Sequence, residues 1–200
     1  MRAFKSTSAA ELKGHLKPDA EAVIAQIREC ARSLYLNRRM LCTEAVVAAL
    51  NNALKGGLSE VQAISMAAPF SIAMGESGCI CGALSGAVMA AGLFLGNDRP
   101  FRHRQQMREG ARQLHDTFKE ANGATCCRIL SRNVKHDRRA HFHQCADLTA
   151  GAAEMAARLI LRRRPELADR AANGSLFRCG SNIGGVWSRS FRFFSRSIRR

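Results

Sequence analysis

Four cysteines occupy positions from which a thiol could do chemistry. Cys42, Cys81 and Cys127 stand where helices are predicted to begin, and Cys145 lies on the apolar stripe of a helix predicted to start near Ala140. The unpaired N–H groups and partial positive charge of a helix start favour a thiolate over a thiol. Thiolates attack disulfides and bind metals, whereas thiols in apolar surroundings are inert. We therefore expect Cys42 and Cys81 each to have a lowered thiol pKa on its own. If the two pack side by side, one should stay protonated unless a metal binds both. Where the fold brings the four cysteines together, we expect a sulfur redox or metal site.

The overall use of cysteine favours reactive thiols over structural disulfides. The chain has eight cysteines, and its first 18 residues contain neither the apolar segment nor the cleavage pattern of a secretory signal. Without secretion, such a cysteine content more often means metal binding, catalysis or redox sensing. We therefore predict a cytoplasmic protein. Cys30, on the apolar stripe of the first predicted helix, is expected to be a buried packing residue, and Cys179 an incidental exposed thiol.

The composition predicts an all-α protein with one domain. Hydrophobic residues make up 46% of the chain and aromatic residues only 6%, while alanine and glycine are abundant. No run of alternating β-branched residues predicts a strand. We expect a compact helical bundle around a central Gly/Ala-rich buried helix, over residues 18–172. A loose arm at residues 1–17 precedes it, and a flexible, disordered basic tail at residues 173–200 follows.

Apolar residues recur at helical spacing in several segments that are bounded by capping and stop residues. The predicted helices run from Pro18 to about Leu36, from Thr43 to about Lys55, from Ser59 to Met66, over about residues 102–120, from about Ala140, and from Pro165.

Residues 77–96 are uncharged and about as long as a membrane span. Eleven of these twenty residues are Gly, Ala or Ser, and only six are Ile, Leu, Val or Phe. Six such side chains supply only about 2–4 kcal/mol towards membrane insertion. The segment is therefore predicted to be the buried central helix of the bundle.

The positive charge is concentrated in the second half of the chain. Residues 1–100 carry 10 basic and 8 acidic side chains, whereas residues 101–200 carry 21 and 8. We expect a weak contact of the basic tail with anionic surfaces. Specific nucleic-acid binding is not expected, and the phosphate-binding and dinucleotide-binding glycine motifs are missing. The sequence leaves homo-oligomerisation open and does not identify a redox partner.

The segments around the four cysteines form an ordered pattern. They read CTEAVVAAL from Cys42, CGALSGAVMAAGLFLG from Cys81, TCCRIL around Cys127, and CADLTAGAAEMAARLI from Cys145. This order resembles the C-GCAxxG-C-C family of redox-active proteins over roughly residues 25–163. The resemblance implies a small α-helical domain in which these four cysteines are the redox-active thiols.

The chain departs from the family pattern around two of the cysteines. The family name contains Gly-Cys-Ala, whereas the order here is Cys-Gly-Ala from Cys81. Cys79 precedes Cys81 by two residues and Cys126 adjoins Cys127, so Cys79 and Cys126 are alternates for the redox positions.

The small residues after Cys81 have a structural role of their own. Gly82, Ala83 and Gly86 would let a facing helix approach Cys81 within disulfide range, where Cα atoms are about 4.4–6.8 Å apart. They would also leave the sulfur uncrowded for an incoming thiol or metal ion.

Three functions remain open from the sequence. The first is dithiol–disulfide exchange or electron transfer of the oxidoreductase type, which needs no cofactor, with Cys42–Cys81 and Cys127–Cys145 as one pairing. The second is binding of zinc or an iron–sulfur cluster by the same four cysteines, with His141, one helical turn before Cys145, as an additional ligand. The third is a structural or interaction domain with inert buried cysteines.

Overall fold

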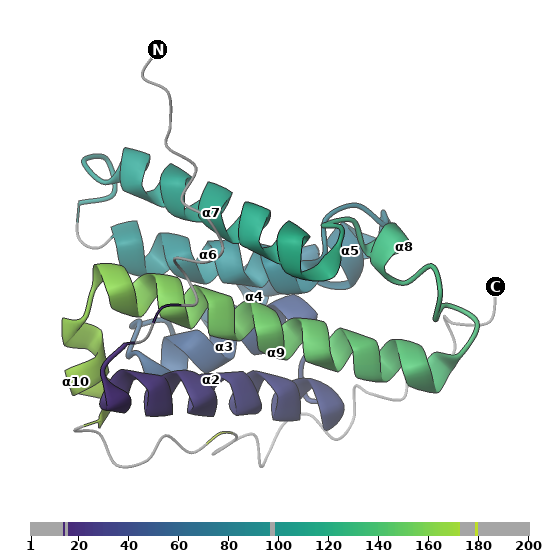
Figure 1. Cartoon of the computed structure of the whole chain (residues 1–200), viewed down its shortest axis with the longest axis horizontal. Coiled ribbons are helices and arrows are strands. Elements are labelled where there is room, and N and C mark those ends of the chain that lie inside the picture. Colours follow the sequence, from purple (N-terminus) through teal and green to yellow (C-terminus); the bar gives the residue numbers. More distant parts are fainter. Residues whose placement is uncertain (1–13, 15, 97–98, 173–178, 180–200) are drawn as a thin grey trace.

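The protein is a bundle of helices with no strand among the residues described in the computed structural model, namely 14, 16–96, 99–172 and 179 (Figure 1). The helices are α2 (Pro18–Leu36), α3 (Cys42–Ala53), α4 (Glu60–Ala67), the 3-10 helix η1 (Ala68–Phe70), α5 (Ser71–Glu76), α6 (Gly82–Gly96), α7 (Arg104–Asn122), α8 (Cys127–Leu130), α9 (Arg138–Arg163) and α10 (Glu166–Ala172). The all-α prediction is confirmed. The arm and tail predicted at the two ends fall almost entirely outside the described residues.

Local signals explain where several helices begin and end. Pro18 occupies the first turn of α2, where its missing N–H costs nothing. Ser59 and Gln62 form a reciprocal capping box at α4, and Asp137 accepts hydrogen bonds from two backbone N–H groups at the start of α9. Gly123 adopts a left-handed conformation, with φ of 77°, that ends α7.

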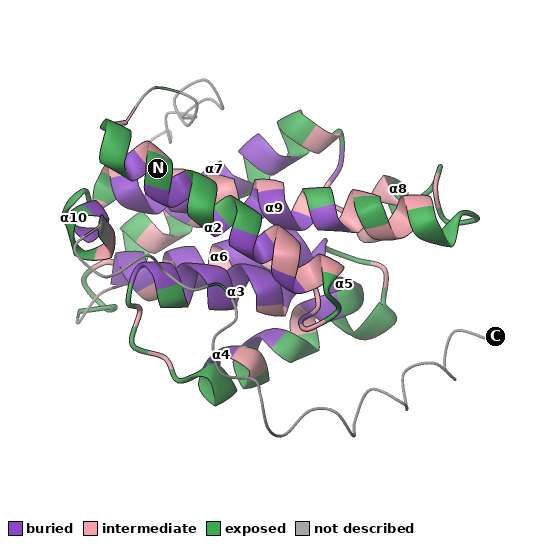
Figure 2. Ribbon diagram, turned by 90° about the horizontal axis from the view of Figure 1, so that it is seen from below, coloured by how far each residue is buried: buried purple, intermediate pink, exposed green. Residues whose placement is uncertain are grey.

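Helix α6 forms the centre of the bundle. It packs against α3, α7 and α9, while α2 covers α9 and α3 from the other side. Both α3 and α6 are buried over most of their length (Figure 2). The predicted central Gly/Ala-rich helix is therefore confirmed, but it begins at Gly82, and residues 77–81 of the predicted segment lie outside it, where Gly78 and Ile80 have positive φ values. None of the helices in the described part of the chain is long and apolar enough to cross a membrane.

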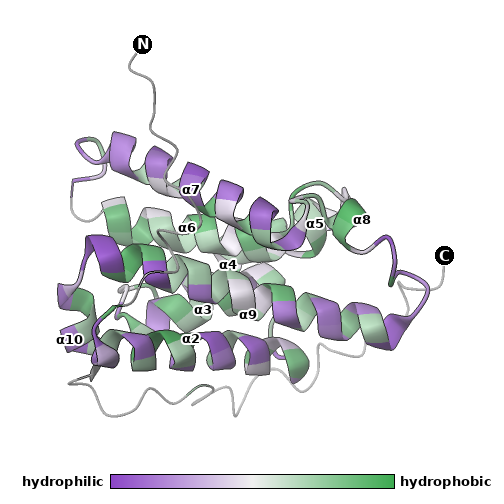
Figure 3. Cartoon of the chain, viewed as in Figure 1, coloured by the Kyte–Doolittle hydropathy of each residue, from purple (hydrophilic) through white to green (hydrophobic). Residues whose placement is uncertain are grey.

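The outer helices are amphipathic. Helix α7 is largely hydrophilic along its exposed side (Figure 3), while Leu114 and Phe118 are each only 1% exposed. This arrangement places apolar surface on the core and charge in water.

The chain makes a left-handed turn in α5, shortly before α6. Ile72, Ala73 and Met74 have φ values of 53°, 56° and 55°, and Gly75 continues the turn with 61°. Each L-residue in this conformation costs roughly 1–2 kcal/mol. The turn lies at the same end of the bundle as α8, on the right of Figure 1. The strained segment is thus at the end where α3 and α6 begin.

Candidate functional site

The structure brings the four predicted cysteines together at this end of the bundle. Cys42 is the first residue of α3, Cys81 directly precedes α6, Cys127 is the first residue of α8, and Cys145 lies near the beginning of α9. The charge of the Cys81 thiolate interacts with those of Cys42 and Cys127, and that of Cys145 with the same two. All four thiols are free. We call this group the four-cysteine cluster.

Close packing of α3 on α6 brings Cys42 to Cys81. A Cβ atom built at Gly86 would lie 2.8 Å from the backbone oxygen of Thr43, so only glycine allows this separation of the helices. The Thr43 hydroxyl donates a hydrogen bond of 2.9 Å to the carbonyl of Gly82. The predicted close approach at the small residues after Cys81 is therefore present, with α3 as the facing helix.

Backbone hydrogen bonds place α8 beside Cys81. The N–H of Cys81 donates to the carbonyl of Thr125 at 2.7 Å, and the N–H of Arg128 donates to the carbonyl of Gly78 at 3.2 Å. These two bonds join the segment before α6 to the start of α8. They hold Cys127 at the edge of the cluster.

Burial raises the pKa of every thiol in the cluster. The pKa of Cys81 rises to about 12 and that of Cys145 to about 11, through burial first and the neighbouring thiolates second. Burial also raises the pKa values of Cys42 and Cys127. The lowering predicted for Cys42 and Cys81 from their helix starts is wrong, whereas the predicted repulsion between neighbouring thiolates does contribute at Cys81. Backbone N–H groups at each helix start bond to the Cys42 sulfur and to the Cys81 sulfur, and these bonds favour the thiolates. The loss of hydration on burial disfavours the thiolates more strongly.

The strained turn of α5 contacts the cluster at Cys42. The backbone N–H of Ile72 donates a hydrogen bond to the Cys42 sulfur, and so does the backbone N–H of Thr43. Ile72 thus has a backbone conformation that is costly for its type while its amide faces a thiol. Left-handed, strained residues that contact a reactive group are often found at functional sites.

Comparison with known protein families agrees with this geometry. Residues 40–159 match the family described as "Putative redox-active protein (C_GCAxxG_C_C)". The chain belongs to the C_GCAxxG_C_C family. The matched segment contains all four cysteines of the cluster, and the family's description agrees with a redox role. No match was found among curated proteins or among solved structures.

Tyr35 is a site residue that sequence reasoning missed. It lies in the last turn of α2, outside the segment that matches the C_GCAxxG_C_C family. Its hydroxyl forms a side-chain hydrogen bond with the Cys145 thiol, and its ring stacks on Phe142 with centroids 5.2 Å apart. Local sequence carries no signal for this contact, because it depends on how α2 packs against α9.

The two alternate cysteines lie beside the cluster in different ways. Cys126 caps α8, and its thiol donates a hydrogen bond of 3.0 Å to the carbonyl of Gly78. Its charge acts on Cys127. Cys79 is exposed, and its backbone N–H donates to the Ser77 hydroxyl at 3.3 Å. Cys126 therefore belongs to the rim of the cluster, and Cys79 to the outer surface.

The metal hypothesis receives no support from the arrangement of the side chains. Within the part of the chain that the structure describes, no group of three or more His, Cys, Asp and Glu side chains is arranged to hold a metal ion. His141 lies in the first turn of α9, where its backbone N–H donates to the Asp137 carbonyl at 2.9 Å.

Cys30 and Cys179 form a disulfide, with Cα atoms 5.3 Å apart. Cys30 is 3% exposed, so its predicted burial is confirmed. The expectation that Cys179 is an incidental free thiol is wrong. The two cysteines are 149 residues apart in the sequence, and no local pattern relates them. The disulfide joins α2 to the chain beyond α10.

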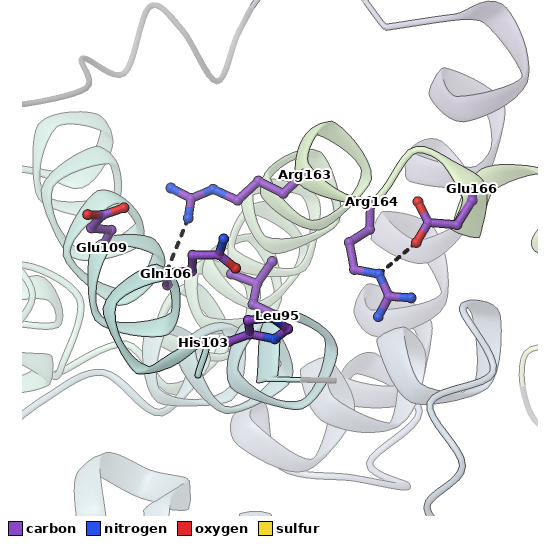
Figure 4. A pocket seen from close by; sticks show the side chains of 7 residues that line it. All are labelled: Leu95, His103, Gln106, Glu109, Arg163, Arg164 and Glu166. Carbon is purple, nitrogen blue, oxygen red and sulfur yellow. Dashed lines mark hydrogen bonds and ion pairs between the residues drawn. The ribbon is translucent and has the colours of Figure 1, made fainter. Parts of the chain in front are cut away.

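A pocket of about 490 Å³ lies at the opposite end of the bundle, between the end of α6, the start of α7 and the end of α9 (Figure 4). Arg164 pairs with Glu166 at 2.7 Å, and Arg163 donates to the backbone carbonyl of Gln106 at 3.1 Å. Its cationic groups are thus engaged within the protein, and its lining contains no cysteine. The four-cysteine cluster is therefore the candidate functional site.

Proposed function

We propose that this member of the C_GCAxxG_C_C family exchanges electron pairs with external disulfides through its four-cysteine cluster. The observation that carries the proposal is the convergence of four free thiols from α3, α6, α8 and α9 at one end of the bundle. The cytoplasmic location expected from the sequence is part of the proposal, because a reducing compartment would return the cluster to its dithiol form.

The proposal assigns the cysteines to an inner and an outer pair. Cys81 is 4% exposed, and Cys42 is the thiol that acts on it most strongly. Cys42, Cys127 and Cys145 are each partly buried, and Cys127 is the thiol that acts most strongly on Cys145. The strongest thiol neighbours of Cys81 and of Cys145 support Cys42–Cys81 as the inner pair and Cys127–Cys145 as the outer pair. Cys42 is in turn the thiol that acts most strongly on Cys127, so it links the two pairs.

The outer pair would react first. The Cys127 thiolate attacks one sulfur of an external disulfide, and the displaced thiolate takes up a proton and leaves as a thiol. Cys145 then attacks the Cys127 sulfur, which closes the Cys127–Cys145 disulfide and releases the second external thiol. Two protein thiols are oxidised and one external disulfide is reduced to two thiols.

The inner pair would pass its electrons outward by the same chemistry. Cys42 or Cys81 attacks the outer disulfide, and a transient disulfide between the pairs resolves to Cys42–Cys81 and two outer thiols. The result moves the oxidised state from the edge of the cluster to its buried part and returns the outer pair to its dithiol form.

The raised pKa values set the character of this couple. A protein dithiol is a strong oxidant when its reduced form is stabilised as a thiolate. Here burial raises the pKa values of all four thiols, so that stabilisation is missing. We therefore expect the cluster dithiols to be reducing agents and to rest as neutral thiols.

The test is to count and map disulfides in the intact chain. Reduced protein, prepared without oxygen, is titrated with oxidised glutathione, its free thiols are counted, and non-reduced peptides are mapped by mass spectrometry. We expect two to four cluster thiols to be lost and recovered with a dithiol reductant. Cys81→Ser and Cys145→Ser should each reduce this capacity by one pair, whereas Cys79→Ser, an exposed neighbour outside the cluster, should leave it unchanged.

Two results would overturn the proposal. One is that none of the four cysteines is ever found oxidised in the titration. The other is that the same anaerobic sample contains stoichiometric zinc or iron that protects these four thiols.

A further inference from the structure

Tyr35 is the chain's single tyrosine, and it approaches the cluster from α2. Its hydroxyl and the Cys145 thiol share a hydrogen bond. The family match begins at residue 40, so Tyr35 lies before the matched segment. The residue therefore adds a hydroxyl group to a site that is otherwise made of thiols and backbone.

Stacking on Phe142 positions the Tyr35 ring. The two rings meet at an interplanar angle of 29°, and Phe142 is itself covered by the Arg38 guanidinium, which lies 5.2 Å from the centroid of the Phe142 ring. Phe142 precedes Cys145 by three residues on α9, a spacing that places the two on the same face of the helix. The stacking partner of Tyr35 therefore also determines where its hydroxyl lies relative to Cys145.

Ion pairs hold the two helices that carry these residues. Arg28 on α2 pairs with Glu154 on α9 at 2.5 Å, and Arg32 pairs with Asp147 at 3.1 Å. The hydrogen bond between Tyr35 and Cys145 lies on the same α2–α9 interface.

The environment keeps the Tyr35 hydroxyl protonated. Burial, followed by the charges of the neighbouring thiols, raises the pKa of Tyr35 above its ordinary value. The hydroxyl can accept a hydrogen bond from a neutral Cys145 thiol and can donate one to the thiolate. The ionisable groups acting on Cys145 are Tyr35 from α2, Cys42 from α3 and Cys127 from α8, and of these only the Tyr35 hydrogen bond favours the thiolate.

We propose that Tyr35 is a catalytic hydrogen-bond donor that stabilises the Cys145 thiolate each time it forms. The proposal rests on the dithiol function and goes beyond it by assigning a residue that is not a cysteine. When an external thiolate attacks Cys127 of the oxidised outer pair, the S–S bond breaks and Cys145 leaves with the electron pair. The Tyr35 O–H donates to this sulfur and keeps its own proton, and water then protonates Cys145. A second external thiol attacks the external sulfur of the mixed disulfide, which forms an external disulfide, and the Cys127 sulfur leaves with the electron pair and takes up the proton of the attacking thiol.

The test replaces Tyr35 with phenylalanine and follows Cys145 alone. Tyr35→Phe keeps the ring and its stacking partner and removes only the hydroxyl. We expect Cys145 alkylation by iodoacetamide, measured by peptide mass spectrometry at one alkaline pH, to slow about tenfold, the change that a shift of one pKa unit produces. Reduction of the outer disulfide by dithiothreitol should slow by a similar factor.

Thr149→Val is the matched control. The Thr149 hydroxyl donates to the backbone carbonyl of Cys145 at 2.7 Å and not to its sulfur. This variant removes a buried hydroxyl one helical turn away and should leave Cys145 alkylation unchanged. The proposal fails if Tyr35→Phe leaves the rate unchanged or if both variants slow it equally.

A measurement on the unaltered chain covers the case in which a variant does not fold. Ionisation of Cys145 should perturb the absorbance of the single tyrosine, and prior alkylation of Cys145 should abolish that change. The proposal is contradicted if the tyrosine absorbance is the same whether Cys145 is ionised or not. Alkylation and absorbance do not require a disulfide. Failure of the Tyr35 proposal can therefore be distinguished from failure of the dithiol function, which would appear as four cysteines that do not undergo oxidation.

Discussion

The Cys42 sulfur lies directly against the backbone of Gly82. A Cβ atom built at Gly82 would lie 2.4 Å from this sulfur, 2.7 Å from the Thr43 hydroxyl and 3.0 Å from the carbonyl oxygen of Phe70. The glycine thus makes room for the thiol that approaches Cys81 from α3. A side chain at this position would compete for the space that the sulfur occupies.

Gly82→Ala should therefore separate the start of α3 from the start of α6. We expect a loss of about 1–3 kcal/mol in the free energy of unfolding, as for other over-packed sites, and slower closure of the Cys42–Cys81 disulfide. Urea unfolding of the reduced protein and timed disulfide mapping measure the two effects. Gly92→Ala on the same helix is the control, because a Cβ atom built at Gly92 has no neighbour within 4 Å. This substitution should raise the free energy of unfolding by about 1 kcal/mol at most. Equal effects of the two substitutions would contradict this explanation.

Stability of the reduced protein should fall as the pH rises into the alkaline range. The folded state raises the pKa of Cys81 to about 12, whereas an unfolded cysteine ionises near its ordinary value of about 8.5. Between these two values the unfolded state releases a proton that the folded state keeps. Each such thiol then lowers the free energy of unfolding by up to about 1.4 kcal/mol per pH unit.

Urea unfolding of the reduced protein from about pH 8 to about pH 10.5 measures this slope. Cys81→Ala should flatten it, and Cys79→Ala, at an exposed position, should not. Identical slopes in the two variants would show that burial of Cys81 does not cause the loss.

Glycine should be favourable in the left-handed turn of α5. Met74 has φ of 55° and is 46% exposed, so Met74→Gly removes backbone strain and little buried surface. We expect the free energy of unfolding to rise by about 1 kcal/mol. Met66→Gly is the matched control, because Met66 is 53% exposed in the right-handed helix α4. The control should lower stability by about 1 kcal/mol, and a loss in both variants would argue against a strained turn.

The disulfide between Cys30 and Cys179 should stabilise the oxidised protein strongly. It closes a loop of 149 residues, for which chain entropy alone gives up to about 5 kcal/mol. Cys179→Ser should therefore unfold at lower urea than the unaltered chain under non-reducing conditions. The difference should vanish in excess reductant, and a difference that persists there would have another origin.

Much of the helical architecture is readable from the sequence because its signals are local. Pro18 begins α2 and Gly123 ends α7, since each residue type favours the backbone conformation needed at its place. The small residues of α6 similarly predict a helix that others approach closely. The placement of Cys42 and Cys81 at helix starts follows from the same local rules.

The chemistry of the site was decided by tertiary structure, because burial and proximity depend on residues far apart in the chain. Local reasoning predicts a lowered pKa for Cys81, but packing removes its water and places other thiols beside it, so its pKa is raised. The hydrogen bond between Tyr35 and Cys145 requires α2 to lie along α9. Ile72 has a left-handed backbone that its residue type disfavours, at a place where its amide contacts Cys42. The sequence by itself determined which thiols are present and where the helices begin, and only the folded chain determined what surrounds each sulfur.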